Sequence, residues 1–406
     1  MKDYRFHTPD GISDILPWEC VIKKDMEKRL RVLFDRHGYL EVETPCLEFL
    51  DVYAGSGFVS PENMYKLTDG AGRLLALRYD GTVPAARVAA TLMREEPLPL
   101  RISYIENMFR FHESGGGRQR EFTQGGVELL GAALPEADGE VISLAILAAR
   151  EVGIRDMQIS LGQVDFFLGL MEEWDVQEED AREISGYIDR KDTVALETAA
   201  DRCHLREADK ETLLLLPSLF GTFDVLDAFS ARVKGKRALA ALSNLREILE
   251  ILEDFDCLSY VSVDLGMLPG LDYYTGMIFK GFTYEIGFPI FSGGRYNHVV
   301  ASFGYDVPAV GFSMGINLCL TALRRQKNLW ETTGINSIIG YEKDRVTRRR
   351  AAELLNALRQ EGKVVLLDCE GMEEEALRKY ARQKGIGEVI FLRTPFDTER
   401  LGKNYE

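Results

Sequence analysis

The chain has 406 residues, of which 46% are hydrophobic and 28% are charged. This globular balance excludes wholesale disorder and a collagen-like fibre, and the length predicts two or three domains. The formal net charge of -16 makes general binding to nucleic acid or to anionic membranes unfavourable. From Glu331 to Glu406 there are 14 basic and 14 acidic residues, so the rest of the chain carries the whole negative excess.

Cysteine usage and the amino terminus indicate the cellular compartment. The six cysteines are scattered without a CxxC pair, which indicates neither a zinc site nor a disulfide framework. The five histidines are dispersed and no HExxH motif occurs, so neither a metal nor another cofactor is expected. The amino terminus lacks an apolar signal core, and no run of about 18 apolar residues is present. We therefore expect a reduced, cytoplasmic protein outside the membrane.

The first 165 residues alternate between helix and strand patterns. Pro17 suits the first position of a helix, which is predicted over 17–37 and ends before Gly38. Alternating residues at 39–44 predict a half-buried strand, and the apolar run at 74–78 predicts another. Further along, the pattern predicts a helix at 83–95, a hairpin with arms at 102–112 and 121–130, a helix at 138–152 and a strand at 156–164.

From about 165 to 256 strand signals vanish and charged helical patterns dominate, which predicts a helical insertion. Strand signals return at 259–266, 274–286 and 309–313, followed by a helix at 314–327. Beyond a boundary near 328–336, the order β-α-β-α-β predicts a small α/β domain with a parallel sheet. Its expected elements are 337–341, 344–361, 364–368, 371–384 and 388–392.

Polar groups at strand ends mark the first two candidate segments. Asp80 and Thr82 follow an apolar strand and can hold an ammonium group, although an Asx-type turn is the common structural explanation. In the hairpin, Arg110 offers planar contacts to a phosphate or carboxylate, although a solvated tip is the ordinary alternative. Even spacing places Gln124 and Glu128 on one face of the second arm. A buried carboxylate there needs a ligand or, more commonly, a structural arginine as its partner.

Two later segments add aromatic hydroxyls and glycines. Tyr273 and Tyr274 follow an acid and suit a small polar ring or amine, although a packed tyrosine pair is the common explanation. The segment 292–297, Ser-Gly-Gly-Arg-Tyr-Asn, precedes the glycine-rich run at 308–317. Glycines there allow the backbone to come close either to a ligand or to another strand.

Taken in order, these segments resemble the histidyl-tRNA synthetase family over most of residues 8–325. The similar stretches are PDGISDILP, RYDGT, FRFHESGGGRQREFTQGGVE, LDYYTG, GGRYN and GFSMG. The resemblance implies an α+β, class II synthetase-like core over 1–327, with an antiparallel sheet, flanking helices and a helical insertion at about 165–256. It also implies a truncated anticodon-binding-like α/β domain over 335–406. Such cores are usually homodimers.

The resemblance extends to the histidine pocket of that family. Asp80 and Thr82 match positions that hold the amino group, with Asp in place of the usual Glu. Arg110 matches the hairpin arginine that contacts the carboxylate and the α-phosphate. The residues that match positions around the amino and imidazole groups are Gln124, Glu128, Tyr273 and Tyr274.

The catalytic cations of the family are missing. Active synthetases carry an arginine before Gly-Leu-Asp-Tyr-Tyr, where this chain has Pro269. Their third motif ends Gly-Φ-Glu-Arg (Φ, apolar) and its Arg holds ATP, whereas this chain has Gly315-Ile316-Asn317-Leu318, with no cation. Losing one preorganised charge costs about 10²–10³ in rate, by analogy with oxyanion-hole removals. We therefore expect no catalytic residue of its own. The acidic body also makes tRNA an unexpected partner.

A synthetase core without ATP chemistry resembles the regulatory subunits of ATP phosphoribosyltransferase. That resemblance implies a partner, the short-form catalytic subunit, in a hetero-octamer that performs the first step of L-histidine biosynthesis. It also implies L-histidine as an inhibitory effector, bound either in the old pocket or at a subunit interface. The alternative is a divergent histidyl-tRNA synthetase, which histidine-dependent pyrophosphate exchange would reveal. A stand-alone amino-acid sensor is a third possibility.

Overall fold

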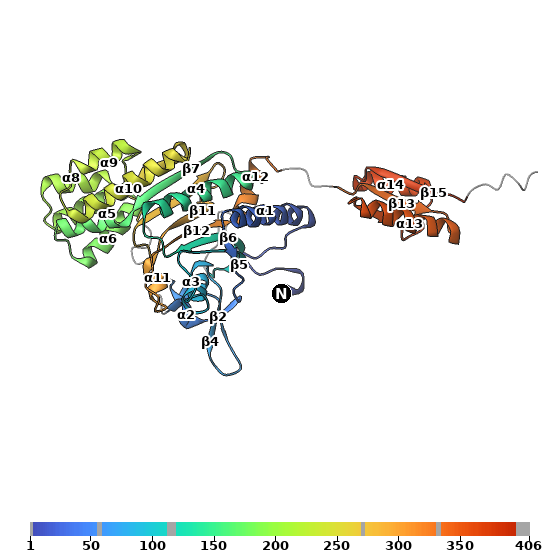
Figure 1. Cartoon of the computed structure of the whole chain (residues 1–406), viewed down its shortest axis with the longest axis horizontal. Coiled ribbons are helices and arrows are strands. Elements are labelled where there is room, and N and C mark those ends of the chain that lie inside the picture. Colours follow the sequence, from blue (N-terminus) through green and yellow to red (C-terminus); the bar gives the residue numbers. More distant parts are fainter. Residues whose placement is uncertain (1–2, 55–58, 112–118, 269–272, 330–333, 395–406) are drawn as a thin grey trace, which may run out of the picture. The chain divides into compact units, whose positions relative to one another are not determined.

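The computed structural model describes residues 3–54, 59–111, 119–268, 273–329 and 334–394. The chain divides into two compact units, Met1–Leu329 and Trp330–Glu406, and each is described by itself (Figure 1). Within the described residues, no helix combines the length and the apolar character needed to span a membrane.

The first unit is built on a nine-stranded sheet and has α+β architecture. Its order is β1-β5-β6-β12-β11-β10-β7-β9-β8, with antiparallel pairing except for the parallel pairs β1–β5 and β7–β9. The antiparallel sheet is therefore confirmed, with a parallel pair near each end. The strands, in sheet order, are Leu40–Glu41, Leu100–Phe109, Glu121–Leu130, Ala309–Gly315, Phe291–Arg295, Met277–Thr283, Met157–Gln163, Val261–Asp264 and Phe220–Gly221.

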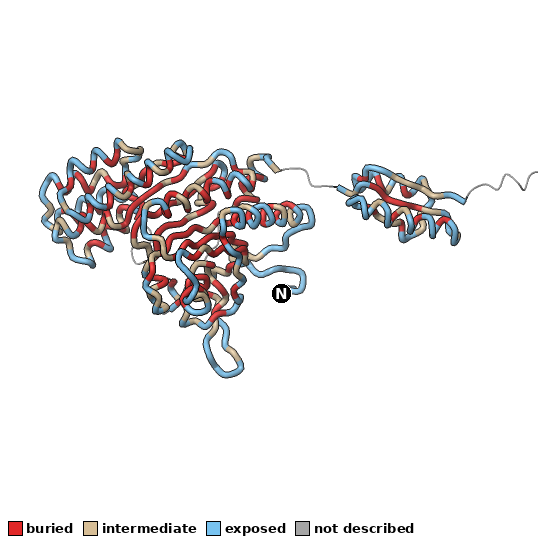
Figure 2. Tube along the Cα trace, viewed as in Figure 1, coloured by how far each residue is buried: buried red, intermediate tan, exposed pale blue. Residues whose placement is uncertain are grey.

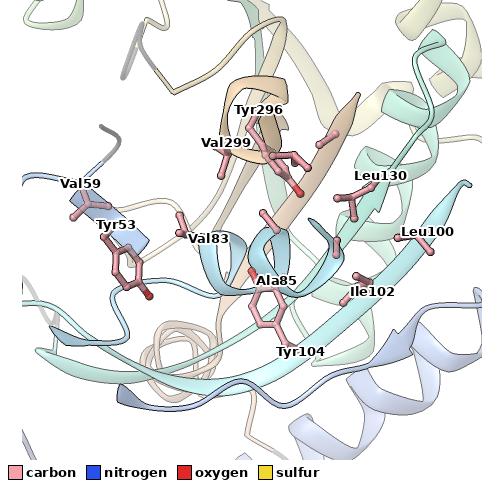
Figure 3. Packing of buried hydrophobic residues seen from close by; sticks show 14 of the residues in the cluster. Tyr53, Val59, Val83, Ala85, Leu100, Ile102, Tyr104, Leu130, Tyr296 and Val299 are labelled. Atoms are coloured by element: carbon pink, nitrogen blue, oxygen red, sulfur yellow. The ribbon is translucent and has the colours of Figure 1, made fainter. Parts of the chain in front are cut away.

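Successive residues of β6 point to opposite faces of this sheet. Gly125 approaches Leu30 of α1 (Pro17–Arg36), the face that α4 (Pro135–Glu151) and α12 (Ile316–Arg325) also cover. Leu130 belongs to a hydrophobic cluster with residues of α3 (Thr82–Thr91) and α11 (Asn297–Ala301) on the opposite face (Figure 3). Since side chains alternate along a strand, Gln124 and Glu128 point toward the α3 face.

A second, three-stranded sheet lies below the α3 face in Figure 1, and only one of its three strands was predicted. Its central strand β4 (Leu74–Leu77) matches the predicted strand, while β2 (Leu47–Phe49) and β3 (Lys66–Thr68) were missed. The prediction of a strand over 39–44 was too long, because only Leu40–Glu41 pairs in the sheet. The connecting elements are α2 (Leu50–Ala54) and the short helices η1 (Tyr4–Phe6) and η2 (Pro61–Asn63).

Six helices fill the segment between β7 and β9. Their apolar stripes pack together, as the buried Leu242, Leu245 and Leu249 of the longest helix illustrate. The expectation that no strand occurs there was wrong, because the short β8 pairs with β9. The helices are α5 (Val164–Glu173), α6 (Glu178–Asp189), α7 (Thr193–Arg202), α8 (Glu207–Leu215), α9 (Phe223–Ser230) and α10 (Lys236–Asp254), and η3 (Leu258–Tyr260) follows.

The second unit contains the predicted parallel sheet, in the order β14-β13-β15. Neighbouring residues of the central strand, Ile338 and Ile339, bury their side chains in separate clusters on opposite faces. One face receives α14 and the other receives α13, so both faces are covered, and the core appears red in Figure 2. The elements are β13 (Ser337–Tyr341), α13 (Arg345–Gln360), β14 (Val365–Leu367), α14 (Glu374–Lys384) and β15 (Glu388–Leu392).

Candidate functional site

Two adjacent pockets open on the α3 face of the large sheet, each with a cavity volume of about 140 Å³. Pocket A is the one lined by Gln124 and Asn317, and pocket B is the one lined by Asp80 and Thr82. A single water needs roughly 10–15 Å³ by the same measure, so each pocket has room for a small molecule. The residues common to both pockets are Arg110, Ser292 and Ser313.

Asp80 reaches pocket B from the turn between β4 and α3, and Thr82 reaches it from the first position of α3. The Asx-type turn is present, because Asp80 Oδ1 accepts a hydrogen bond of 3.0 Å from the Val83 amide. Burial raises the pKa of the Asp80 carboxyl, while this amide and the nearby Arg110 charge act in the opposite direction. The structural and the binding explanations are therefore compatible, since the turn fixes a carboxylate at the pocket wall.

Arg110 stands between the pockets, directly after β5. Its guanidinium lies over the rings of Tyr79 and Phe122, at 4.7 and 5.0 Å from their centroids. Its Nε donates to the Tyr79 carbonyl oxygen at 3.3 Å, and its backbone amide donates to the Arg120 carbonyl oxygen at 2.8 Å. These contacts orient a cation toward any anionic group that enters either pocket. The hairpin tip, including His112, lies outside the described residues.

The tyrosine pair forms an aromatic wall of pocket B. The Tyr273 and Tyr274 rings meet edge to face with centroids 4.7 Å apart, and Tyr273 lies 6.2 Å from Tyr296. Burial raises the pKa of both Tyr273 and Tyr274, and the nearby Asp80 and Glu128 carboxyls add to the effect. These hydroxyls therefore remain protonated and can act as hydrogen-bond donors.

Glu128 lies behind pocket B and is only 1% exposed. Its oxygens accept hydrogen bonds from the hydroxyls of Tyr104 at 3.1 Å and Tyr296 at 2.5 Å. Burial raises the pKa of this carboxyl to about 8, although the hydroxyls of Tyr296, Thr82 and Tyr104 offset part of the effect. A structural arginine was the commoner partner expected for this carboxyl. Among the described residues, tyrosine hydroxyls take that place.

The residues that hold Glu128 were missed by the sequence reasoning. Tyr104 and Tyr296 sit in an apolar cluster and read as packing residues (Figure 3). Gly311 lies opposite Glu128 in the β6–β12 register, and an added Cβ there would stand 1.9 Å from Glu128 Oε2. The absence of a side chain at Gly311 therefore lets the Glu128 carboxyl lie close against β12. The glycine-rich run at 308–317 was the feature of the sequence that could have indicated this close approach.

Pocket A has a different polar lining. Gln124 donates from Nε2 to Ser313 Oγ at 3.3 Å, while its buried Oε1 accepts no hydrogen bond from the described residues. Asn317 uses both ends of its amide on the protein, accepting from the Thr123 amide at 2.9 Å and donating to Gln119 Oε1 at 2.8 Å. The second altered position, Pro269, lies outside the described residues.

The arrangement separates two kinds of chemistry. Pocket B offers a carboxylate, a cation and protonated tyrosines within one cavity, which suits a small amphoteric molecule. Among the described residues lining pocket A, Arg110 is the sole cation, whereas stabilising a triphosphate takes several cations. No cluster of three or more metal-ligating side chains occurs in the described part of the chain. The structure thus brings together Asp80, Thr82, Arg110, Gln124, Glu128, Tyr273, Tyr274 and Asn317.

Comparison with known proteins places this geometry in a family. A family model described as histidyl-tRNA synthetase matches residues 11–318. The ATP phosphoribosyltransferase regulatory subunit of Acetivibrio thermocellus is 46% identical over 391 residues, which cover 96% of this chain and 93% of that protein. The one of Ruminiclostridium cellulolyticum is 43% identical, over 97% of this chain and 94% of that protein.

Solved structures agree with these relatives. A structure described as an ATP phosphoribosyltransferase regulatory subunit/histidyl-tRNA synthetase from Bacillus halodurans aligns with a TM-score of 0.87 and 28% identity, covering 97% of this chain and 100% of that one. Histidyl-tRNA synthetase from Nostoc sp. PCC 7120, at 21% identity and a TM-score of 0.80 over 94% of this chain and 90% of that one, shows the shared fold. The chain therefore belongs to the ATP phosphoribosyltransferase regulatory subunits, a non-catalytic family with a histidyl-tRNA synthetase-like fold.

Proposed function

We propose that this chain assembles with a short-form ATP phosphoribosyltransferase catalytic subunit and is required for the first step of L-histidine biosynthesis. The transferase chemistry, with ATP, phosphoribosyl pyrophosphate and Mg²⁺, lies wholly on that partner. The observation that carries the proposal is the contrast between the two pockets that share Arg110. Pocket B keeps its polar lining, whereas the stretch Gly315-Ile316-Asn317-Leu318 brings no cation to pocket A. We further propose a homodimer of this chain within a hetero-octamer.

L-histidine is the proposed ligand of pocket B. An α-carboxylate can pair with the Arg110 guanidinium, and an α-ammonium group can pair with Asp80 and Thr82, all of which line that cavity. Gln124 stands beside them, next to Ser313. An imidazole ring carries a donor and an acceptor, which suits protonated tyrosines and a carboxyl that titrates near neutral pH.

The regulatory role follows from linkage between two binding events. If histidine and the catalytic subunit prefer different states of this chain, each changes the affinity for the other by the same factor. Such coupling free energies are typically about 1–3 kcal/mol, which is enough for feedback inhibition of the first step by the end product.

The second unit does not serve tRNA in this proposal. It is an anticodon-binding-like α/β domain, in which both faces of the three-stranded sheet are covered by helices. Residues 331–406 carry equal numbers of basic and acidic residues, and the rest of the chain carries the net charge of -16, which opposes binding to a polyanion. The assembly is proposed to work in the cytoplasm, where all six cysteines would remain reduced.

The test is to mix the full chain with a short-form catalytic subunit and to assay phosphoribosyl transfer with and without L-histidine. We expect activity only in the mixture and inhibition by histidine. The Glu128→Gln variant should retain the activation but lose most of the inhibition, and Glu178→Gln, a surface carboxyl on α6, should behave as the parent. An active mixture in which Glu128→Gln is inhibited normally would remove the effector from pocket B.

A further inference from the structure

One chain of hydrogen bonds leaves pocket A and ends on the N-terminal segment. Asn317 lines the pocket, and its Nδ2 donates to Gln119 Oε1 at 2.8 Å. The other end of the Gln119 amide donates from Nε2 to Ser13 Oγ at 2.6 Å. Residues far apart in the sequence are thus joined by two consecutive side-chain contacts. We refer to Asn317, Gln119 and Ser13 together as the amide link.

The position of Asn317 explains how the link begins. The β6–β12 ladder ends at the pair Gly315 and Gln124, after which the chain turns into α12. The next amide of β6, on Thr123, donates instead to Asn317 Oδ1 at 2.9 Å. The side chain therefore extends the sheet by one rung.

A backbone contact lies beside the outer end of the link. The Arg120 amide donates to the Gly11 carbonyl oxygen at 2.7 Å, next to the contact between Gln119 and Ser13. Gly11 has φ +76°, and an added Cβ would stand 2.8 Å from Arg120 Cγ, so the segment lies closely against the hairpin arm. The Arg120 amide is consequently a reporter of whether the N-terminal segment is in place.

We propose that Asn317 is a positioning residue that holds the N-terminal segment against the hairpin arm through Gln119. This role does not depend on the ligand of either pocket. A molecule in pocket A that takes the N–H that Asn317 donates to Gln119 breaks the link and loosens residues 11–13. Pocket A and the N-terminal segment are therefore coupled in this chain.

Two substitutions at one position separate this role from simple capping of β6. Asn317→Asp keeps an acceptor for Thr123, and a rotated Gln119 can donate to its second oxygen while accepting from the Ser13 hydroxyl. Asn317→Leu has similar size but neither donor nor acceptor, so it breaks the link. Ser13→Ala breaks the outer contact alone and leaves the pocket intact.

The experiment is hydrogen exchange of the full chain, resolved to the Arg120 and Thr123 amides. In Asn317→Leu we expect both amides to exchange roughly threefold to tenfold faster, as loss of a single net hydrogen bond predicts. Arg120 should also exchange faster in Ser13→Ala, whereas Asn317→Asp should match the parent at Arg120. If Arg120 is unchanged in both Asn317→Leu and Ser13→Ala, the proposal is wrong and Asn317 only caps β6. Should Asn317→Leu fail to fold, Ser13→Ala alone gives the decisive result.

Discussion

Pockets A and B have equal volumes and share Arg110, Ser292 and Ser313, yet their remaining polar groups differ. Pocket B is lined by a carboxylate and tyrosines, with the buried Glu128 behind them. Pocket A is lined by amides, and the amide of Asn317 is already bonded to the protein. In the proposed function, a change of side chains without loss of the cavity is enough to separate amino-acid recognition in pocket B from nucleotide chemistry in pocket A. Each prediction below tests one side of that contrast.

The largest expected effect concerns pocket A. Two preorganised cations of the active family are missing here, one at Pro269 and one from the stretch Gly315-Ile316-Asn317-Leu318, and each loss costs about 10²–10³ in rate. We therefore expect histidine-dependent pyrophosphate exchange to be at least about 10⁴-fold slower than in an active histidyl-tRNA synthetase measured in parallel. Exchange within tenfold of that enzyme, and abolished by Arg110→Ala, would make the chain a synthetase after all.

The next effect concerns the charge state behind pocket B. Glutamate ordinarily titrates near 4.5, but burial raises the pKa of Glu128 to about 8 in the folded chain. The folded state binds more protons within this window, so stability falls as the pH rises from about 5 to 8. Glu128→Gln cannot ionise at this position. Over the same pH range its free energy of unfolding should fall less than that of the parent, and the difference should be on the order of a few kcal/mol.

Urea unfolding at several pH values measures this slope. Asp138, whose pKa burial raises to about 7, is present in both chains and cancels in the comparison. The surface variant Glu178→Gln should keep the slope of the parent. Equal slopes for the parent and Glu128→Gln would show that this carboxyl is ionised throughout the window.

A third prediction concerns the close approach of β12 to Glu128. Gly311→Ala places a Cβ 1.9 Å from Glu128 Oε2 and 2.5 Å from the Val127 carbonyl oxygen. Overpacking of this kind costs about 1–3 kcal/mol or more, and L-histidine binding should weaken with it. Gly287→Ala is the matched control, because nothing lies within 4 Å of its added Cβ. Equal melting temperatures for the two variants would contradict the observed packing.

The smallest expected effect comes from one hydroxyl. Tyr296→Phe removes the donor to Glu128 Oε2 and leaves the donor on Tyr104 in place. We expect a loss of about 1–2 kcal/mol in the free energy of unfolding. Tyr260→Phe, whose hydroxyl makes no hydrogen bond with the described residues, should change stability by less than about 0.5 kcal/mol. A Tyr296→Phe variant as stable as its control would mean that the bond contributes nothing net.

The sequence predicted elements where the local pattern is strong. The arms of β5 and β6 follow from alternation around a glycine tip, and the parallel C-terminal sheet follows from its β-α order. Strands of two or three residues, such as β3 and β8, are too short to show a period. Their pairing depends on neighbours that are distant in sequence.

The same limit applies to the candidate site. Asp80, Arg110 and Tyr273 could be proposed because polar groups at strand ends are unusual in an apolar pattern. Tyr104 and Tyr296 could not, because a buried tyrosine reads as packing until its hydroxyl partner is seen. The amide link joins three separate segments, so no local pattern contains it.

The most direct test of the central contrast is calorimetry on the isolated chain, titrated with L-histidine and, separately, with ATP and Mg²⁺. The account predicts one histidine bound per chain, weakened at least tenfold by Arg110→Ala, and no heat from the nucleotide. Binding of ATP without binding of histidine would contradict it, because pocket A would then be the working site and pocket B the abandoned one.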